Sequence, residues 1–414
     1  MVKQKKSDRV ACVMASGGVT GMAYEVGALR ALDHAMVERT VNSFDTYVGT
    51  SAGAIVASFA AAGITSATQA QALAGTLPGF PNLDRWRIYR PNVAEAGSRL
   101  RSAVGYAAAA TWRSWSGREP WPGAGPPSLP SLLPSGLFTT SGLEAYVRQS
   151  LEIAGIPDML GSIRADLQLV ATELETASRV AFSPGSHGGV PISKAVAASA
   201  AIPALFRPVE IDRRRYVDGA VTGRAGIDLA VQRGAGLVVV INGLVPLNTA
   251  ELAARSMNGG LRSTVYDRGL RGVQNQVRRE SQHEDLLSQL RMLEKAHPEV
   301  DFVLIEPRPD DEKMPFHQLM SFRARMIVMQ HGYESVAAGL LAGWDHVAEV
   351  FSEHGIRLDD GLLRRPDVSI PVADLADRGS LIRRLRRTAL DRRLRARGGE
   401  AARQSLEPAG AVPA

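Results

Sequence analysis

Hydrophobic positions along this chain follow two different periods, and the two alternate. Short apolar runs predict β-strands, and the continuous runs at 236–242 and 301–307 are typical of central strands covered on both faces. Apolar residues at helical spacing, or an Ala-rich segment without proline, predict helices. The other predicted strands are residues 10–15, 44–49, 167–172 and 179–183, and the first two helices are residues 22–37 and 51–63. This alternation favours an α/β fold with a largely parallel central sheet.

One region interrupts the pattern. Residues 76–136 are rich in Pro, Gly, Ser and Ala, and they hold four of the five tryptophans. These are Trp86, Trp112, Trp115 and Trp121. We expect an irregular insertion here. Its tryptophans would either meet lipid as part of a lid over the site or pack into a small core of their own.

The net charge of +6 comes from one segment near the end of the chain. Residues 383–397 hold eight arginines and one aspartate, a local charge of +7, so subtraction leaves the rest of the chain at about −1. The body therefore lacks the basic excess that would suggest nucleic acid as a partner. We expect residues 346–414 to form a C-terminal extension. Its Arg-rich tail is either solvated or in contact with anionic lipid headgroups.

Composition indicates a cytoplasmic protein. A chain of 414 residues with 45% hydrophobic content can bury a large core, and its single cysteine, Cys12, excludes an intramolecular disulfide. No stretch approaches the roughly 20 apolar residues of a membrane span. Clusters of Asp, Glu and His at metal-ligand spacing are absent from the sequence, so we expect neither a metal nor another cofactor.

The first candidate for chemistry is a serine between two glycines. In "YVGTSAGAI" (47–55), Ser51 follows a predicted strand and begins a predicted helix. The spacing of Gly49, Ser51 and Gly53 fits a nucleophile elbow, a strained turn that exposes the serine hydroxyl at a helix N-terminus. The alternative is that Ser51 only caps the helix.

A glycine cluster, "SGGVTG" (16–21), follows the first predicted strand and opens the first helix. Such a turn can hold phosphates, but Ser16 stands where a dinucleotide fingerprint has its first glycine. The backbone N–H groups of Gly17 and Gly18 could instead form an oxyanion hole for Ser51. A simple tight turn is the third alternative.

A nucleophilic serine also needs a base. In "RYVDGAVTG" (215–223), a predicted strand ends at Tyr216 and Val217, and Asp218 lies in the turn before Gly219, although ordinary turn chemistry also favours Asp-Gly. Among the histidines, His317 and His331 lie at plausible distances downstream. Spacing alone does not choose between a Ser-Asp dyad and a triad with histidine.

Several ordered segments resemble the patatin-like phospholipases, a family of Ser-Asp dyad lipid acyl hydrolases. "SGGVTGMAYEVGALRAL" is similar to the family's Gly-rich loop and following helix, "GTSAGA" to its elbow and "YVDGA" to its Asp-Gly element. "GLFTTSGLEAYVR", "LVATELETASRVAFS" and "AVAASAAIPALFRPV" add to the likeness, which covers residues 8–245.

The resemblance implies a three-layer α/β domain over residues 8–345 and a serine esterase of the phospholipase A or lysophospholipase type. It implies Ser51 as nucleophile, Asp218 as base and the backbone of Gly17, Gly18 and Val19 as oxyanion hole. Gly21, Gly49, Gly53 and Gly219 would support these elements. The substrate would be a phospholipid or another acyl-ester lipid, and the Arg-rich tail is the candidate for peripheral contact with an anionic membrane. The alternative function is a lipid-binding or scaffold protein without catalysis.

Overall fold

A nine-stranded sheet forms the centre of the molecule. The computed structural model describes residues 7–116, 133–223, 225–248, 264–308, 320–365 and 381–384. The strand order is β12-β11-β10-β1-β2-β5-β9-β8, with β6 also paired to β5. The strands from β11 to β5 run parallel to one another, and antiparallel strands flank them. The expected largely parallel sheet is therefore confirmed.

Most of the sheet strands lie close to predicted ones, whereas the strands at Val209–Ile211 and Leu381–Arg384 were not predicted. The sheet strands are β1 (Val10–Met14), β2 (Thr46–Thr50), β5 (Asp166–Glu173), β6 (Ser178–Phe182), β8 (Val209–Ile211), β9 (Arg214–Asp218), β10 (Leu237–Ile241), β11 (Asp301–Glu306) and β12 (Leu381–Arg384). A small second sheet joins β3 (Arg90–Pro91), β4 (Gly136–Thr139) and β7 (Ala204–Phe206).

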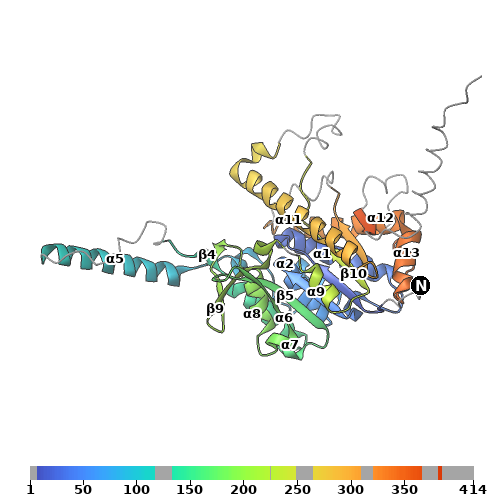
Figure 1. Ribbon diagram of the computed structural model, residues 1–414, viewed down its shortest axis with the longest axis horizontal. Helices are drawn as coiled ribbons and strands as arrows, with labels where there is room; N and C mark the ends of the chain where they lie inside the picture. Colours follow the sequence, from blue (N-terminus) through green and yellow to red (C-terminus); the bar gives the residue numbers. More distant parts are fainter. Residues whose placement is uncertain are drawn as a thin grey trace, which may run out of the picture.

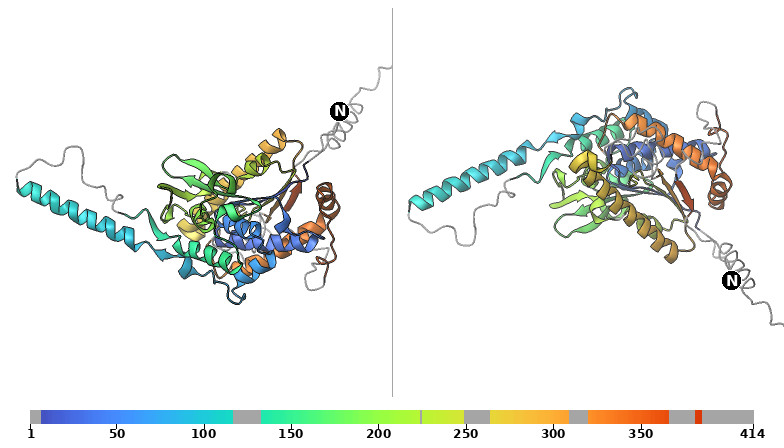
Figure 2. Two further views of the ribbon diagram at one scale, coloured as in Figure 1. Left: turned by 90° about the horizontal axis from the view of Figure 1, so that it is seen from below. Right: turned by 90° about the horizontal axis from the view of Figure 1, so that it is seen from above.

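Helices cover both faces of the large sheet and make a three-layer structure (Figures 1 and 2). Side chains of β1 alternate between two separate cores, with Cys12 in one and Val13 in the other, because successive residues of a strand point to opposite faces. The first core is shared with α1 (Gly18–Ala35), α2 (Ala52–Ala61), α6 (Ser141–Ile153), α8 (Ile192–Ser199), α12 (Arg325–Ala342) and α13 (Trp344–Glu353). The second is shared with α9 (Ile227–Gln232) and α11 (Gly269–Ala296).

Further helices and turns complete the described fold. The remaining helices are α3 (Ser66–Ala74), α4 (Arg85–Ile88), α5 (Val93–Trp115) and α7 (Pro184–His187). Single 3₁₀ turns occur at Val41–Ser43, Leu160–Ser162, Gly219–Thr222 and Tyr266–Arg268. Every helix among the described residues is too short or too polar to span a bilayer.

The segment 76–136 is not irregular throughout, as the composition suggested. Residues Val93–Trp115 form one continuous helix, α5, which extends away from the body (Figures 1 and 2). The prolines of this segment lie before or after α5, and α5 itself is rich in alanine. The composition of the whole segment therefore hid the helical propensity of its central part. Trp121 lies outside the described residues.

The C-terminal part is attached to the body more closely than the sequence suggested. The boundary expected after residue 345 falls inside α13, where Val350 and Phe351 are buried in the first core. Farther on, Leu363 is also fully buried. Strand β12, which includes Arg383 and Arg384 of the Arg-rich tail, pairs antiparallel with β11. Residues 385–397 of the tail lie outside the described residues.

One buried carboxyl group is left without a partner in this core. Glu25 of α1 is fully buried, and neither carboxyl oxygen has a hydrogen-bond partner within the described ranges. Because burial penalises the charged form, the pKa of Glu25 is raised well above its usual range. Glu25 therefore keeps its proton in the folded protein at pH values where the unfolded chain would release it.

This predicts that Glu25→Gln makes the protein more stable at pH 8 but not at pH 4. As the pH rises above the ordinary glutamate pKa of about 4.3, ionisation of Glu25 favours the unfolded chain, and the variant lacks this penalty. Thermal unfolding at pH 4, 6 and 8 measures the difference. Glu152→Gln, at an exposed position of α6, is the control and should show no such trend. A stability difference that is the same at every pH would contradict the prediction.

Candidate active site

Ser51 lies in a sharp turn between β2 and α2. Its backbone has φ 57° and ψ −120°, an unusual conformation for a residue other than glycine. Ser51 takes the N-cap position of α2, yet its side chain makes no capping hydrogen bond. The hydroxyl is instead directed at Asp218, with Oγ 2.6 Å from Asp218 Oδ2. The geometry favours a strained nucleophile turn over a helix cap.

Asp218 is fully buried at the end of β9 and is held from several sides. Its second carboxyl oxygen, Oδ1, accepts the N–H of Ala220 at 2.8 Å. Its backbone N–H donates to the carbonyl of Ala201 at 2.9 Å, and its own carbonyl accepts the hydroxyl of Thr172 at 3.1 Å. With both the side chain and the backbone fixed, the carboxylate has little freedom to turn away from Ser51.

Burial raises the pKa of Asp218 above its usual range. The positive charge of Arg278 and the hydrogen bonds from Ser51 and Ala220 act in the opposite direction, because they stabilise the ionised form. A carboxylate that is desolvated but still ionised is a stronger proton acceptor than one in water. The environment therefore suits Asp218 to act as a base toward the Ser51 hydroxyl.

A third residue, Ser199, holds the turn in place and was not singled out from the sequence. The buried Ser199 hydroxyl accepts the backbone N–H of Ser51 at 2.8 Å and donates to the carbonyl of Val170 at 2.6 Å. It thereby links α8, the nucleophile turn and β5. The segment around Ser199 contributed to the family resemblance, but nothing in its spacing pointed to this bridge.

Two motif glycines allow the elements of the site to approach closely. A Cβ at Gly53 would lie 2.4 Å from the carbonyl oxygen of Met14, so the first turn of α2 meets the end of β1 only without a side chain there. A Cβ at Gly219 would lie 2.2 Å from the carbonyl oxygen of Val170, within β5. Gly49 lies in β2, two residues before Ser51.

The glycine cluster leads from β1 into α1 beside the serine. Gly17 is the N-cap of α1, Gly18 has φ 60°, and Gly21 donates its N–H to the carbonyl of Gly17 at 2.9 Å. Gly18 and Val19 line the same cavity as Ser51. Since the first N–H groups of a helix have no partner within the helix, they are suited to hold a negatively charged oxygen.

The cavity at Ser51 is apolar and has a wider hollow as its neighbour. Residues that line it with Ser51 include Met22, Ile55, Leu83, Ile88, Leu143, Ile202 and Phe206, and its volume is about 40 Å³. Met320 lines both this cavity and a hollow of about 830 Å³, whose wall includes Trp86, Tyr89, Leu137, Phe138 and Leu205. Within the segment 76–136, residues 83–91 thus contribute to the walls of the cavity and the hollow, whereas α5 extends away from the body (Figure 2).

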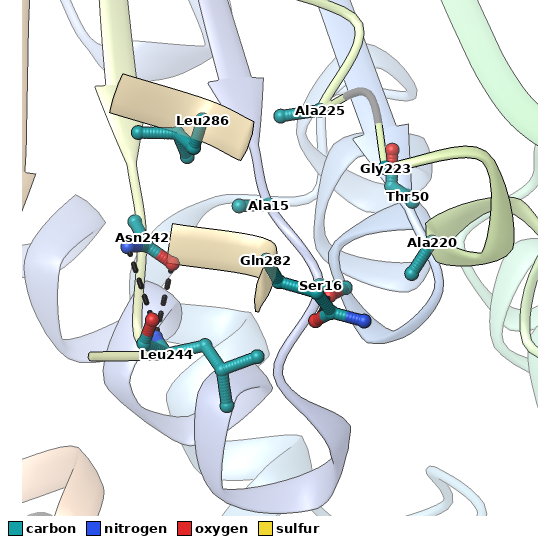
Figure 3. A pocket seen from close by; sticks show the side chains of 10 residues that line it. All are labelled: Ala15, Ser16, Thr50, Ala220, Gly223, Ala225, Asn242, Leu244, Gln282 and Leu286. Carbon is teal, nitrogen blue, oxygen red and sulfur yellow. Dashed lines mark hydrogen bonds between the residues drawn. The ribbon is translucent and has the colours of Figure 1, made fainter. Parts of the chain in front are cut away.

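A smaller and more polar cavity, of about 20 Å³, lies on the α11 side (Figure 3). Thr50, the residue before the nucleophile, lines it together with Ala220 and Gly223. Ser16 and Gln282 also line it, and the Ser16 hydroxyl donates to Oε1 of Gln282 at 2.7 Å. The two sides of the site therefore differ, with apolar side chains on the α2 side and polar groups on the α11 side.

Histidine does not take part in this arrangement within the described residues. No histidine there is hydrogen-bonded to Ser51 or Asp218. His331 is buried in α12, and His317 lies outside the described residues. Across the part of the chain that the structure describes, no group of three His, Cys, Asp or Glu residues could hold a metal ion.

Much of the chain is similar in sequence to a known protein family. The sequence profile of the family Patatin-like phospholipase matches residues 13–231, more than half of the chain. This stretch contains Ser51 and Asp218 together with the glycine cluster. A similar solved structure is the crystal structure of VipD from Legionella pneumophila, which is 14% identical in sequence. The match covers 86% of this chain and 68% of that chain, with a TM-score of 0.34.

The bridge through Ser199 generates a prediction. Ser199→Ala should lower the free energy of unfolding by about 1–3 kcal/mol, because it leaves the buried N–H of Ser51 without an acceptor. Urea denaturation measures the loss. Ser58→Ala is the matched control, since the buried Ser58 hydroxyl donates only to a carbonyl of its own helix, that of Ala54. Equal losses in the two variants would contradict a special role for Ser199.

Proposed function

Because the chain belongs to the patatin-like phospholipase family, we propose that it is a serine lipid acyl hydrolase that uses Ser51 and Asp218 as a dyad. The observation that carries this proposal is the 2.6 Å hydrogen bond between the two side chains, at the edge of an apolar cavity. The enzyme class we propose is a carboxylic ester hydrolase of the phospholipase A or lysophospholipase type. Its substrate is a phospholipid or another acyl-ester lipid.

Ester cleavage would proceed in two halves. Asp218 Oδ2 accepts the proton of the Ser51 hydroxyl while Oγ attacks the carbonyl carbon of the ester. The tetrahedral intermediate then releases the alcohol, which takes the proton from Asp218, and leaves an acyl group on Ser51. In the second half, Asp218 removes a proton from water, the resulting hydroxide attacks the acyl group, and the fatty acid leaves as Ser51 regains its proton.

The negative charge that develops on the carbonyl oxygen needs hydrogen-bond donors. We assign this role to the backbone N–H groups of Gly17, Gly18 and Val19, at the N-terminus of α1. They lie in a fixed turn, and the helix dipole there favours negative charge. The apolar cavity beside Ser51 would hold the acyl chain, because Ile55, Leu83 and Leu143 offer no competing polar groups.

The dyad generates a prediction about catalysis. Ser51→Ala and Asp218→Asn should each lower kcat for a p-nitrophenyl ester by about 10³-fold or more, and the double variant should be hardly slower, because the two residues act as a unit. A fluorophosphonate probe should label the wild type but not Ser51→Ala.

The raised pKa of Asp218 also predicts the pH dependence of the wild type. As the pH falls, Asp218 takes up a proton and can no longer act as a base, so activity should be lost at a pH above the ordinary aspartate range. A profile of kcat against pH measures this.

The control for these experiments is Ser58→Ala, a buried serine in the same helix that should keep full activity. Additive losses in the double variant would argue against a dyad. Wild-type protein that binds lipid, hydrolyses no ester and takes no label would instead support the alternative, a lipid-binding or scaffold protein.

We also propose that α5 contacts the lipid surface from which the substrate is taken. Trp112 and Trp115 are 62% and 83% exposed, and Leu100 and Val104 on the same helix are exposed as well. Arg101 and Arg113 add positive charge. A helix with exposed tryptophans and arginines and no covering core is suited to lie in a membrane interface.

This predicts a selective effect of Trp112→Ala combined with Trp115→Ala. Activity on anionic phospholipid vesicles should fall several-fold, because the helix loses its interfacial side chains, while hydrolysis of a soluble ester stays level. Vesicle co-sedimentation measures the binding. Met292→Ala, at an exposed position of α11, is the control. Unchanged vesicle binding would remove α5 from the lipid contact.

A further inference from the structure

Helix α11 is fixed over the site by contacts on two loops. The Gln282 side chain accepts the hydroxyl of Ser16, next to the glycine cluster, at 2.7 Å (Figure 3). The guanidinium of Arg279 donates to the carbonyl of Val245 at 3.1 Å, in the loop that follows β10. These contacts set the rotation of α11, so the face that it presents to the site is determined.

Arg278 lies on that face. Gln274, Arg278 and Gln282 are spaced by four residues, so they follow one another along one side of the helix. Gln274 lines the wide hollow, and Gln282 contacts the loop before α1. Arg278 is therefore placed between this hollow and the loop of the proposed oxyanion hole.

The guanidinium of Arg278 has no protein partner among the described residues. It is partly buried, yet no carboxylate forms an ion pair with it and no carbonyl accepts its N–H groups there, in contrast to its neighbour Arg279. Its charge is close enough to act on Asp218. An arginine that is withdrawn from water without a partner is costly unless it meets an anion during function.

We propose that Arg278 is a specificity-determining residue that binds the phosphate of the lipid substrate while the acyl chain occupies the apolar cavity. This inference rests on the proposed function, since it assumes that Ser51 acts on an ester. In this proposal, the two parts of the lipid lie on the two chemically different sides of the site. The acyl chain lies against α2, and the headgroup leaves past α11, where an arginine can donate two hydrogen bonds to a phosphate. The substrate class is thus an acyl ester with a nearby phosphodiester, rather than a neutral glyceride.

The test compares two lipids with the same acyl chains, phosphatidylcholine and diacylglycerol, in neutral detergent micelles. Because neither lipid gives the micelle a net charge, attraction to the surface does not contribute. Arg278→Gln should lower kcat/KM for phosphatidylcholine by about tenfold or more, the scale of a lost charge-assisted hydrogen bond, and change that for diacylglycerol much less. Rates are compared on the alkaline plateau, where Asp218 is ionised in every variant. Arg278→Lys should restore part of the preference.

Arg291→Gln, at an exposed position of the same helix, is the matched control and should leave both rates unchanged. A second measurement needs no hydrolysis. Calorimetric binding of monomeric dodecylphosphocholine to the Ser51→Ala protein should weaken about tenfold or more when Arg278→Gln is added. Equal losses on both lipids, or unchanged binding in this second measurement, would overturn the proposal. Wild-type protein that hydrolyses neither lipid would count against the proposed function, and the binding measurement would still decide the role of Arg278.

Discussion

The hydrogen bond between Ser51 and Asp218 depends on the length and register of a single strand, β5. On one side, β5 pairs in parallel with β2, and Val170 lies opposite Thr50, the last residue of β2. β5 then continues past the end of β2 to Glu173, and these further residues pair antiparallel with β9. Asp218 lies opposite Ala171, one position beyond Val170. Strand β9 therefore ends with Asp218 next to the turn that follows β2.

The same construction explains why a charge can be placed in a fully buried position. Asp218 is withdrawn from water, but its two carboxyl oxygens are bonded to the Ser51 hydroxyl and the Ala220 N–H. A buried carboxylate is tolerated when its lone pairs are satisfied and a positive charge is near, as Arg278 is here. The desolvation that costs stability also increases the basicity of the carboxylate. Burial of Asp218 therefore lowers stability while it suits the carboxylate to the proposed role of a base, and the hydrogen bonds to its oxygens offset part of that cost.

The helices divide the surroundings of the dyad into two chemical environments. On the α2 side, the cavity is formed mainly by apolar side chains, and Met320 also lines the neighbouring hollow, whose wall includes aromatic residues. On the α11 side, Ser16, Gln282 and Arg278 present polar groups. An amphiphilic ester fits such a division, because its acyl chain and its headgroup leave the reacting carbonyl in different directions. The exposed helix α5 lies outside both environments. The proposed contact with a lipid surface therefore involves other residues than the binding of a single lipid molecule at the dyad.

The sequence by itself determined most strands of the large sheet and the largely parallel α/β arrangement, because these follow from local patterns. The three-layer architecture and the roles of the site residues were expected from the resemblance to a family. Continuous apolar runs specify buried strands. The Gly-x-Ser-x-Gly pattern specifies a tight turn, because the conformation of a turn depends on the few residues within it. The choice between Ser51 as a cap and Ser51 as a partner of Asp218 needed the tertiary structure, since the two residues are 167 positions apart and meet only through the register of β5. The same holds for Ser199 and Arg278. Their neighbours in space come from distant segments of the chain, so no pattern in the local sequence indicates them. In α5, conversely, a local helical preference was hidden by averaging over the proline-rich residues around it.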